Sequence, residues 1–255
     1  MGHLDRYLDE SGTKGSTASR DQTRATAIYY RALCRQGLDR LADQDGGPEA
    51  TRIRAELAGF EDEFSDLPEV VVGALGVRLR AEIKTGDVAA GRATLARMEH
   101  RGADHRATVR GHLRIATALL RNEDDTLRAA AYRSYRLWLL AERPTRPEHW
   151  LKAGKGLETL DRLDDARDVY QAGLDVFAKD PPDNRPELLF RIRRRLARVT
   201  LRLGDLDAAA ASYRHLVSDK TSMNPYYGDE EIKTRMEQLD RGEVNVADTE
   251  ELEIP

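Results

Sequence analysis

Three segments of the chain repeat one pattern: a short turn, followed by a helix-forming stretch with small residues inside. They are KTGDVAAGRATLARME (residues 84–99), RLDDARDVYQAGLDVF (162–177) and RLGDLDAAAASYRHLV (202–217). A single helix pair cannot bury its apolar face, so recurring pairs stack on one another. The recurrence therefore predicts a chain of packed helix pairs.

Composition supports an all-α fold. Apolar residues recur at helical spacing through residues 22–241, and the helix formers Ala, Leu, Arg and Glu dominate. The formal net charge is −4 and the sequence pI is about 5.9. This charge balance does not favour nucleic acid or an anionic membrane as a partner.

Turn residues place the helix boundaries, because Gly, Asp and Pro gather between the periodic stretches and no Pro falls inside one. The predicted pairs are 68–85 with 87–101, 105–121 with 124–142, 147–162 with 164–179, and 186–203 with 205–219. The chain is long enough for these pairs to bury a real core.

The remaining segments flank this array. Residues 1–21 are rich in Ser, Gly and Thr and predict a flexible N-terminal arm or linker. Within a helical domain spanning 22–241, residues 22–64 predict a divergent N-terminal pair and 228–241 a polar capping helix. Residues 242–255 form an acidic C-terminal tail.

The third and fourth pairs carry an ordered set of landmark residues. The third pair has Trp150, Ala153, Gly154, Leu157, Ala166, Tyr170 and then Pro181, and the fourth has Leu196, Ala197, Thr200, Ala209 and Tyr213. This order resembles the tetratricopeptide repeat (TPR) family, over roughly residues 68–219 and best over 147–219. Landmarks at 91, 131, 166 and 209 are 40, 35 and 43 residues apart, longer than the family's period of about 34.

The landmarks suit close packing of two helices. We expect Gly154 and Ala166 to let paired helices approach, and Trp150 and Tyr170 to fill the adjoining hollows. The resemblance implies a right-handed α-α superhelix, a TPR-like solenoid of about four pairs with a concave groove. A generic antiparallel helical bundle is the alternative.

An arginine-rich stretch, FRIRRRLARVTLRLGD, supplies the candidate binding residues. Arg191, Arg194 and Arg198 lie at i, i+3 and i+7 on one helical stripe. The resemblance places them on the groove side, together with Glu148 and Lys155 of the third pair. Arg binds carboxylates in a bidentate fork, so the stripe is expected to hold an acidic or carboxylate-bearing segment of a partner protein or peptide. A solvated face paired with neighbouring acids and a nucleic-acid contact are the alternatives.

No pattern for catalysis or a cofactor stands out. KAGKGLET (152–159) lacks the spacing of a phosphate-binding loop, the histidines form no metal motif, and no nucleophile triad is visible. The lone Cys34 excludes an internal disulfide and a cysteine-based zinc site, and is expected to pack on an apolar helix face. We therefore expect a protein that is not an enzyme, with no cofactor and no bound metal.

The expected function is that of a non-catalytic scaffold or adaptor that binds another protein in the groove. The alternative is a regulatory or sensory arm of a larger protein whose effector domain lies outside this chain. No membrane span or signal peptide is visible, which favours a cytoplasmic location. The sequence does not specify the partner's identity or the oligomeric state.

Overall fold

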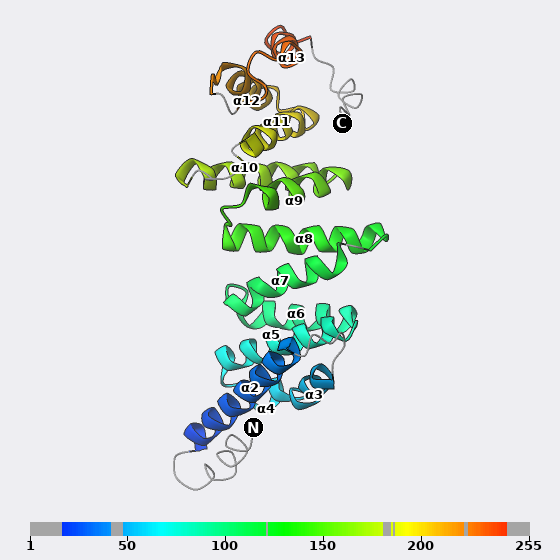
Figure 1. Ribbon diagram of the computed structural model, residues 1–255, viewed down its shortest axis with the longest axis vertical. Helices are drawn as coiled ribbons and strands as arrows, with labels where there is room; N and C mark the ends of the chain where they lie inside the picture. Colours follow the sequence, from blue (N-terminus) through cyan, green and yellow to red (C-terminus); the bar gives the residue numbers. More distant parts are fainter. Residues whose placement is uncertain are drawn as a thin grey trace. The chain divides into compact units, whose positions relative to one another are not determined.

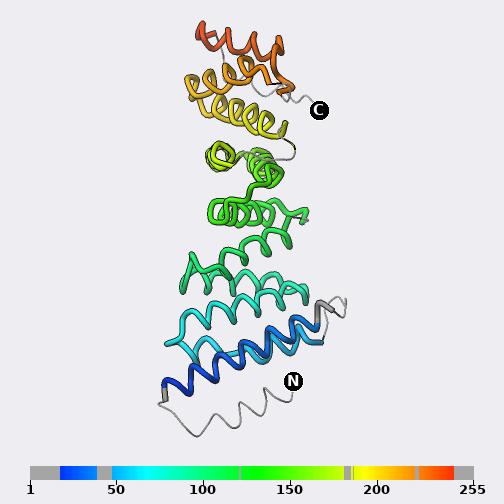
Figure 2. Tube along the Cα trace, turned by 60° about the vertical axis from the view of Figure 1, so that its left-hand side comes forward, coloured from blue at the N-terminus to red at the C-terminus, as the bar shows by residue number. Residues whose placement is uncertain are grey.

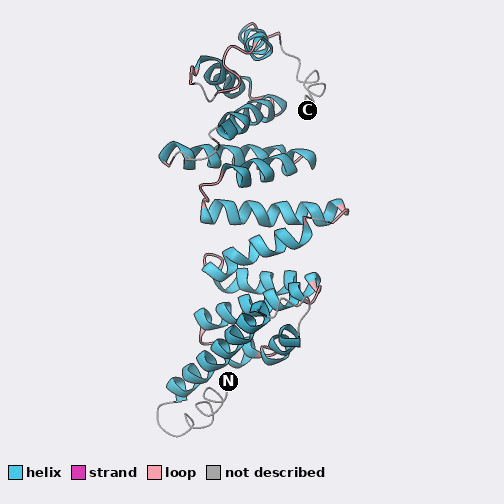
Figure 3. Cartoon of the chain, in the orientation of Figure 1, coloured by secondary structure: helices cyan, strands magenta, loops and turns pink. Residues whose placement is uncertain are grey.

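The computed structural model describes residues 17–41, 48–120, 122–180, 185, 187–221 and 224–243. Every regular element in these ranges is a helix (Figure 3). Most of the expected arm (1–16) and of the acidic tail (244–255) lies outside them. The chain divides into two compact units, Met1–Ser134 (unit 1) and Tyr135–Pro255 (unit 2).

Unit 1 contains α2 (Thr17–Leu41), α3 (Pro48–Glu56), α4 (Phe60–Glu63), α5 (Pro68–Lys84), α6 (Val88–Gly102) and α7 (Arg106–Leu119) (Figure 1). Helix α8 (Asp125–Glu142) crosses the boundary after Ser134. Unit 2 contains α9 (Pro147–Thr159), α10 (Leu163–Lys179), α11 (Glu187–Arg202), α12 (Leu206–Ser218) and α13 (Glu230–Asp240). Most helices that are neighbours in sequence within a unit pack side by side, from α4 to α7 in unit 1 and from α9 to α13 in unit 2 (Figure 2).

The expected all-helical fold is confirmed, with boundaries of the paired helices that agree to within a turn. Three of the expected pairs, α5 with α6, α9 with α10 and α11 with α12, pack together as predicted. The repeated turn has one geometry at two of its occurrences. Gly86 and Gly204 take φ values of 79° and 80°, the left-handed region that ends a helix. The next residue, Asp87 or Asp205, then accepts a hydrogen bond from a backbone N–H in the first turn of α6 or α12, at 3.0 and 3.1 Å.

Three details in the N-terminal part differ from expectation. Helix α2 begins at Thr17, so its first residues fall within the expected arm. Residues 48–64 form two helices because Gly59 takes a φ of 74° and interrupts the run. The packing expected for Cys34 is wrong: its side chain is exposed, since α2 turns the face with Ala25 and Ala32 towards the core.

Helix α5 is the centre of unit 1. It contacts α2, α3, α4, α6 and α7, and every residue from Val71 to Val77 is buried. Two glycines of α5 allow its neighbouring helices to pack this closely against it. A Cβ on Gly73 would lie 3.1 Å from the Tyr29 ring of α2, and one on Gly76 would lie 3.0 Å from the Ala107 Cβ of α7. Both helices therefore lie against bare α5 backbone.

In unit 2 the expected packing role of Gly154 is confirmed. A Cβ on Gly154 would lie 2.1 Å from the Tyr170 ring, so that ring occupies the space that a side chain would fill. The reverse contact joins the same pair of helices: Trp150 of α9 is fully buried, and a Cβ on Gly173 of α10 would lie 3.0 Å from its indole. Each helix thus presents a glycine to the other's aromatic side chain.

Replacing Gly154 by Ala should lower the free energy of unfolding by about 1–3 kcal/mol, because the new methyl group overpacks against Tyr170. Urea unfolding followed by circular dichroism measures this change in the free energy of unfolding. The control is Gly37→Ala in α2, where a Cβ meets no heavy atom within 4 Å. That change should be neutral or stabilising by up to about 1 kcal/mol. Equal effects of both substitutions would contradict the packing account.

Candidate functional site

The structure places the five residues that the sequence nominated on two helices of unit 2, α9 and α11. Arg191 on α11 and Lys155 on α9 are exposed. Glu148, at the start of α9, lies 3.4 Å from the Arg185 guanidinium. No ion pair joins Glu148 to Lys155 or to the α11 arginines among the described residues.

The other two arginines of the stripe already have intramolecular partners. The Arg198 guanidinium forms an ion pair and hydrogen bond with Glu158 of α9. Arg195, its neighbour on α11, donates to the same carboxylate at 3.1 Å. The Arg194 guanidinium lies over the Tyr226 ring, 5.2 Å from its centroid. Arg198 therefore fits the alternative interpretation of the arginine stripe, in which its charges pair with neighbouring acids of the same chain.

Glu158 is the centre of this arrangement. Its side chain is 4 % exposed, and it also accepts a hydrogen bond from the Tyr170 hydroxyl. Burial and the Glu158 carboxylate raise the pKa of Tyr170, so its hydroxyl stays protonated and donates. A carboxylate this buried needs its cationic partners, because removing one leaves an uncompensated charge.

Arg198→Glu should therefore lower the free energy of unfolding by about 3 kcal/mol or more, since it places a second carboxylate beside Glu158. Arg191→Glu makes the same charge change on an exposed position of the same helix and should change stability by less than about 0.5 kcal/mol. Urea unfolding of both variants measures the difference. A small loss for Arg198→Glu would show that the Glu158 pairing is not structural.

Unit 1 contains a different basic site, a cavity of about 240 Å³ between α2, α5 and the start of α7. We call it the basic cavity. Four arginines line it, Arg80 from α5 and Arg106, Arg110 and Arg114 from α7. Tyr29, Leu33 and Gln36 of α2 and Gly73, Gly76 and Val77 of α5 form its walls, and His105 and Ala107 complete it. The two glycines that admit α2 and α7 to α5 thus also lie at its surface.

The three arginines of α7 stand at i, i+4 and i+8, on one stripe. None of the three makes an ion pair or hydrogen bond with any residue that the structure describes. Arg80 donates to the Gln36 side-chain oxygen at 2.6 Å. The basic cavity therefore holds several positive charges on the α7 stripe without acidic partners.

The surroundings of Arg114 disfavour the charged form of its side chain. Burial, together with the positive charges of Arg80 and Arg110, lowers the pKa of Arg114 to about 10. At neutral pH the side chain remains charged, so folding holds repelling cations together at a cost. Burial also raises the pKa of Tyr29, and its hydroxyl makes no hydrogen bond with a described residue. Tyr29 is thus available as a neutral donor.

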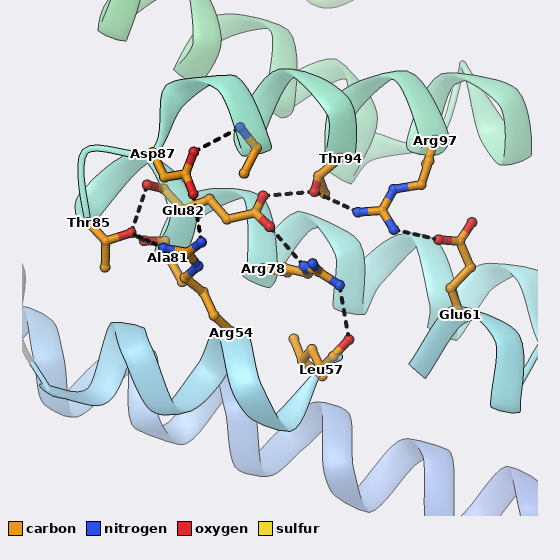
Figure 4. A network of polar contacts seen from close by, with 11 residues as sticks. Arg54, Leu57, Glu61, Arg78, Ala81, Glu82, Thr85, Asp87, Thr94 and Arg97 are labelled. Carbon is orange, nitrogen blue, oxygen red and sulfur yellow. Dashed lines mark hydrogen bonds and ion pairs between the residues drawn. The ribbon is translucent and has the colours of Figure 1, made fainter. Parts of the chain in front are cut away.

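Many other arginines of unit 1 pair with acidic side chains. Those without an ion pair among the described residues, Arg20, Arg92 and Arg133, are exposed, as are Arg106 and Arg110, whereas Arg114 is half-buried without such a pair. Figure 4 shows one network of paired arginines, in which the buried Glu82 accepts from Arg78 at 2.8 Å and from Thr94 at 2.7 Å. In the same view Arg97 donates to Thr94 at 2.8 Å and pairs with Glu61 at 3.1 Å. Acidic partners are thus plentiful in this unit, but they do not reach the α7 stripe.

Sequence reasoning missed the basic cavity. A signal was present in RATVRGHLR, where arginines recur every four residues from Arg106. Such a stripe of like charges is mildly unfavourable on a helix, which makes it informative. What the sequence does not show is that α2 and α5, distant along the chain, form a cavity together with that stripe.

Within the described ranges, no group of three or more His, Cys, Asp or Glu side chains is placed to hold a metal ion. None of the described helices is long and apolar enough to cross a membrane. No protein-family profile matches the chain, and no curated protein is similar enough in sequence to count as a relative.

Proposed function

We propose that this chain is a non-catalytic recognition module of TPR-like helix pairs that binds an anionic group of its ligand in the basic cavity of unit 1. One observation carries the proposal: Arg106, Arg110 and Arg114 line a cavity and have no acidic partner among the described residues. In a chain with net charge −4, such a cluster is not a by-product of overall basicity.

The energetics favour a bound anion. Like charges four residues apart on a helix destabilise it by about 0.2–0.5 kcal/mol per pair, and burial adds to that cost at Arg114. A bound anion attracts these arginines and so offsets their mutual repulsion and the cost of burial. Each charge-assisted hydrogen bond to the anion contributes about 1.5–3 kcal/mol. Sites that are unfavourable when empty are typical of binding function.

The residues at the cavity suit binding rather than proton transfer. Arginine stays protonated at neutral pH and so holds charge without exchanging protons. Both ring nitrogens of His105 are engaged: Nδ1 accepts from the Ala107 N–H at 3.1 Å, and Nε2 lies 3.2 Å from a Glu69 carboxylate oxygen. The proposal keeps the expected scaffold or adaptor role and the expected acidic partner. It moves the main contact from the α11 stripe to the basic cavity.

A binding assay with two unrelated anions tests this function. Isothermal titration calorimetry of the full chain, at low salt, would use a hexaglutamate peptide and inorganic pyrophosphate as probes. At least one probe should bind with one-to-one stoichiometry. The double variant Arg110→Gln/Arg114→Gln should weaken that binding at least about tenfold, because it removes two charge-assisted hydrogen bonds.

The matched control is Arg191→Gln/Lys155→Gln, which removes the same two charges from exposed positions in unit 2. It should leave the affinity within about twofold. Absence of binding by either probe, or equal losses in the two double variants, would contradict the proposed function.

A further inference from the structure

We infer that the ligand of the basic cavity is a small phosphate monoester, whose phosphoryl group meets Arg110 and Arg114 and whose organic part lies against α2 and α5. This inference rests on the proposed function and names the chemistry of its ligand. A phosphate monoester differs from an acidic protein segment in two ways. It carries more negative charge on a single group, and the part of it that the cavity must hold is smaller.

Charge favours a phosphoryl group over a carboxylate. A phosphate monoester carries about −1.5 to −2 charges at pH 7 and three terminal oxygens, whereas a carboxylate carries one charge and two oxygens. Arg80 and Arg110 are both near enough to Arg114 to act on its ionisation. The forks of Arg110 and Arg114 can each donate two hydrogen bonds, which exceeds the needs of one carboxylate but matches a near-dianion, while Arg80, which is bonded to Gln36, adds only its charge.

The end of α7 adds to the same potential. Arg106 and Ala107, the first residues of this 14-residue helix, line the cavity. The N-terminus of a helix carries about half a positive charge and favours phosphate groups. The helix terminus acts at the Arg106 end of the cavity, about one turn before Arg110 and two turns before Arg114, and its Ala107 N–H already donates to His105 Nδ1.

Size and lining limit the organic part. The cavity volume of about 240 Å³ lies below the range of about 300–1,000 Å³ that is typical for drug-sized ligands. Leu33 and Val77 offer apolar contact, and Tyr29 offers both a ring face and a free hydroxyl donor. These groups fit a compact organic moiety of metabolite size attached to the phosphate.

Titration calorimetry with matched ligands tests the inference. The phosphate esters are glycerol 3-phosphate, glucose 6-phosphate and adenosine monophosphate. Glucuronate keeps the hexose ring but has a carboxylate, and glucose has no charge. At least one ester should bind one-to-one and at least tenfold more tightly than glucuronate, while glucose should not bind.

Two tyrosines that are neighbours in sequence provide the matched variants. Tyr29→Phe removes the hydroxyl at the cavity and should weaken binding of the ester three- to tenfold. Tyr30→Phe removes a hydroxyl from the exposed side of α2, where the side chain is 54 % exposed, and should change nothing. Arg110→Gln should abolish the preference for the ester over glucuronate. Circular dichroism and thermal unfolding of each variant check that the fold is retained.

The outcomes separate this inference from the function on which it rests. Glucuronate or hexaglutamate binding as tightly as every ester, with loss in Arg110→Gln/Arg114→Gln, overturns the phosphate assignment and leaves the proposed function standing. A phosphoserine peptide binding tenfold more tightly than every free ester overturns the small-molecule assignment. No anion binding at all, or ester binding that the arginine variants do not change, overturns both.

Discussion

Close approach of helix backbones at residues without a side chain is the constraint on which both units depend. In unit 2, Gly154 and Gly173 admit the rings of Tyr170 and Trp150, so α9 and α10 interlock. In unit 1, Gly73 and Gly76 bring α2 and α7 onto α5. Close-packed interiors leave no slack at such contacts, so these positions fix which faces of the surrounding helices point inwards.

The same constraint creates the candidate site. Because α2 and α7 both lie against α5, the arginine stripe of α7 lines an open cavity whose other walls come from those two helices. Two buried carboxylates, Glu158 and Glu82, are by contrast each held by arginine and by a hydroxyl. At the cavity, the half-buried Arg114 instead lies near two other arginines with no acidic partner among the described residues, which is the basis for assigning the stripe to a ligand.

Local signals in the sequence predicted the helices, their turns and the role of Gly154, since periodicity, glycine and aspartate act over a few residues. Features that depend on distant partners were not predictable in this way. The capture of Arg198 by Glu158 joins residues 40 positions apart, and the exposure of Cys34 depends on which face of α2 meets α5. The basic cavity needs three helices at once, so no single segment of sequence reveals it.

Unit 1 holds several positively charged arginines close together at a cost in folding free energy, which a bound anion would offset. The stability of Arg114→Gln without ligand tests this claim most directly. At an ionic strength of about 0.01 M the variant should have a higher melting temperature than the parent protein. The difference should shrink near 1 M salt, where the screening length falls from about 30 Å to about 3 Å. A variant less stable than the parent protein at low salt would contradict the account.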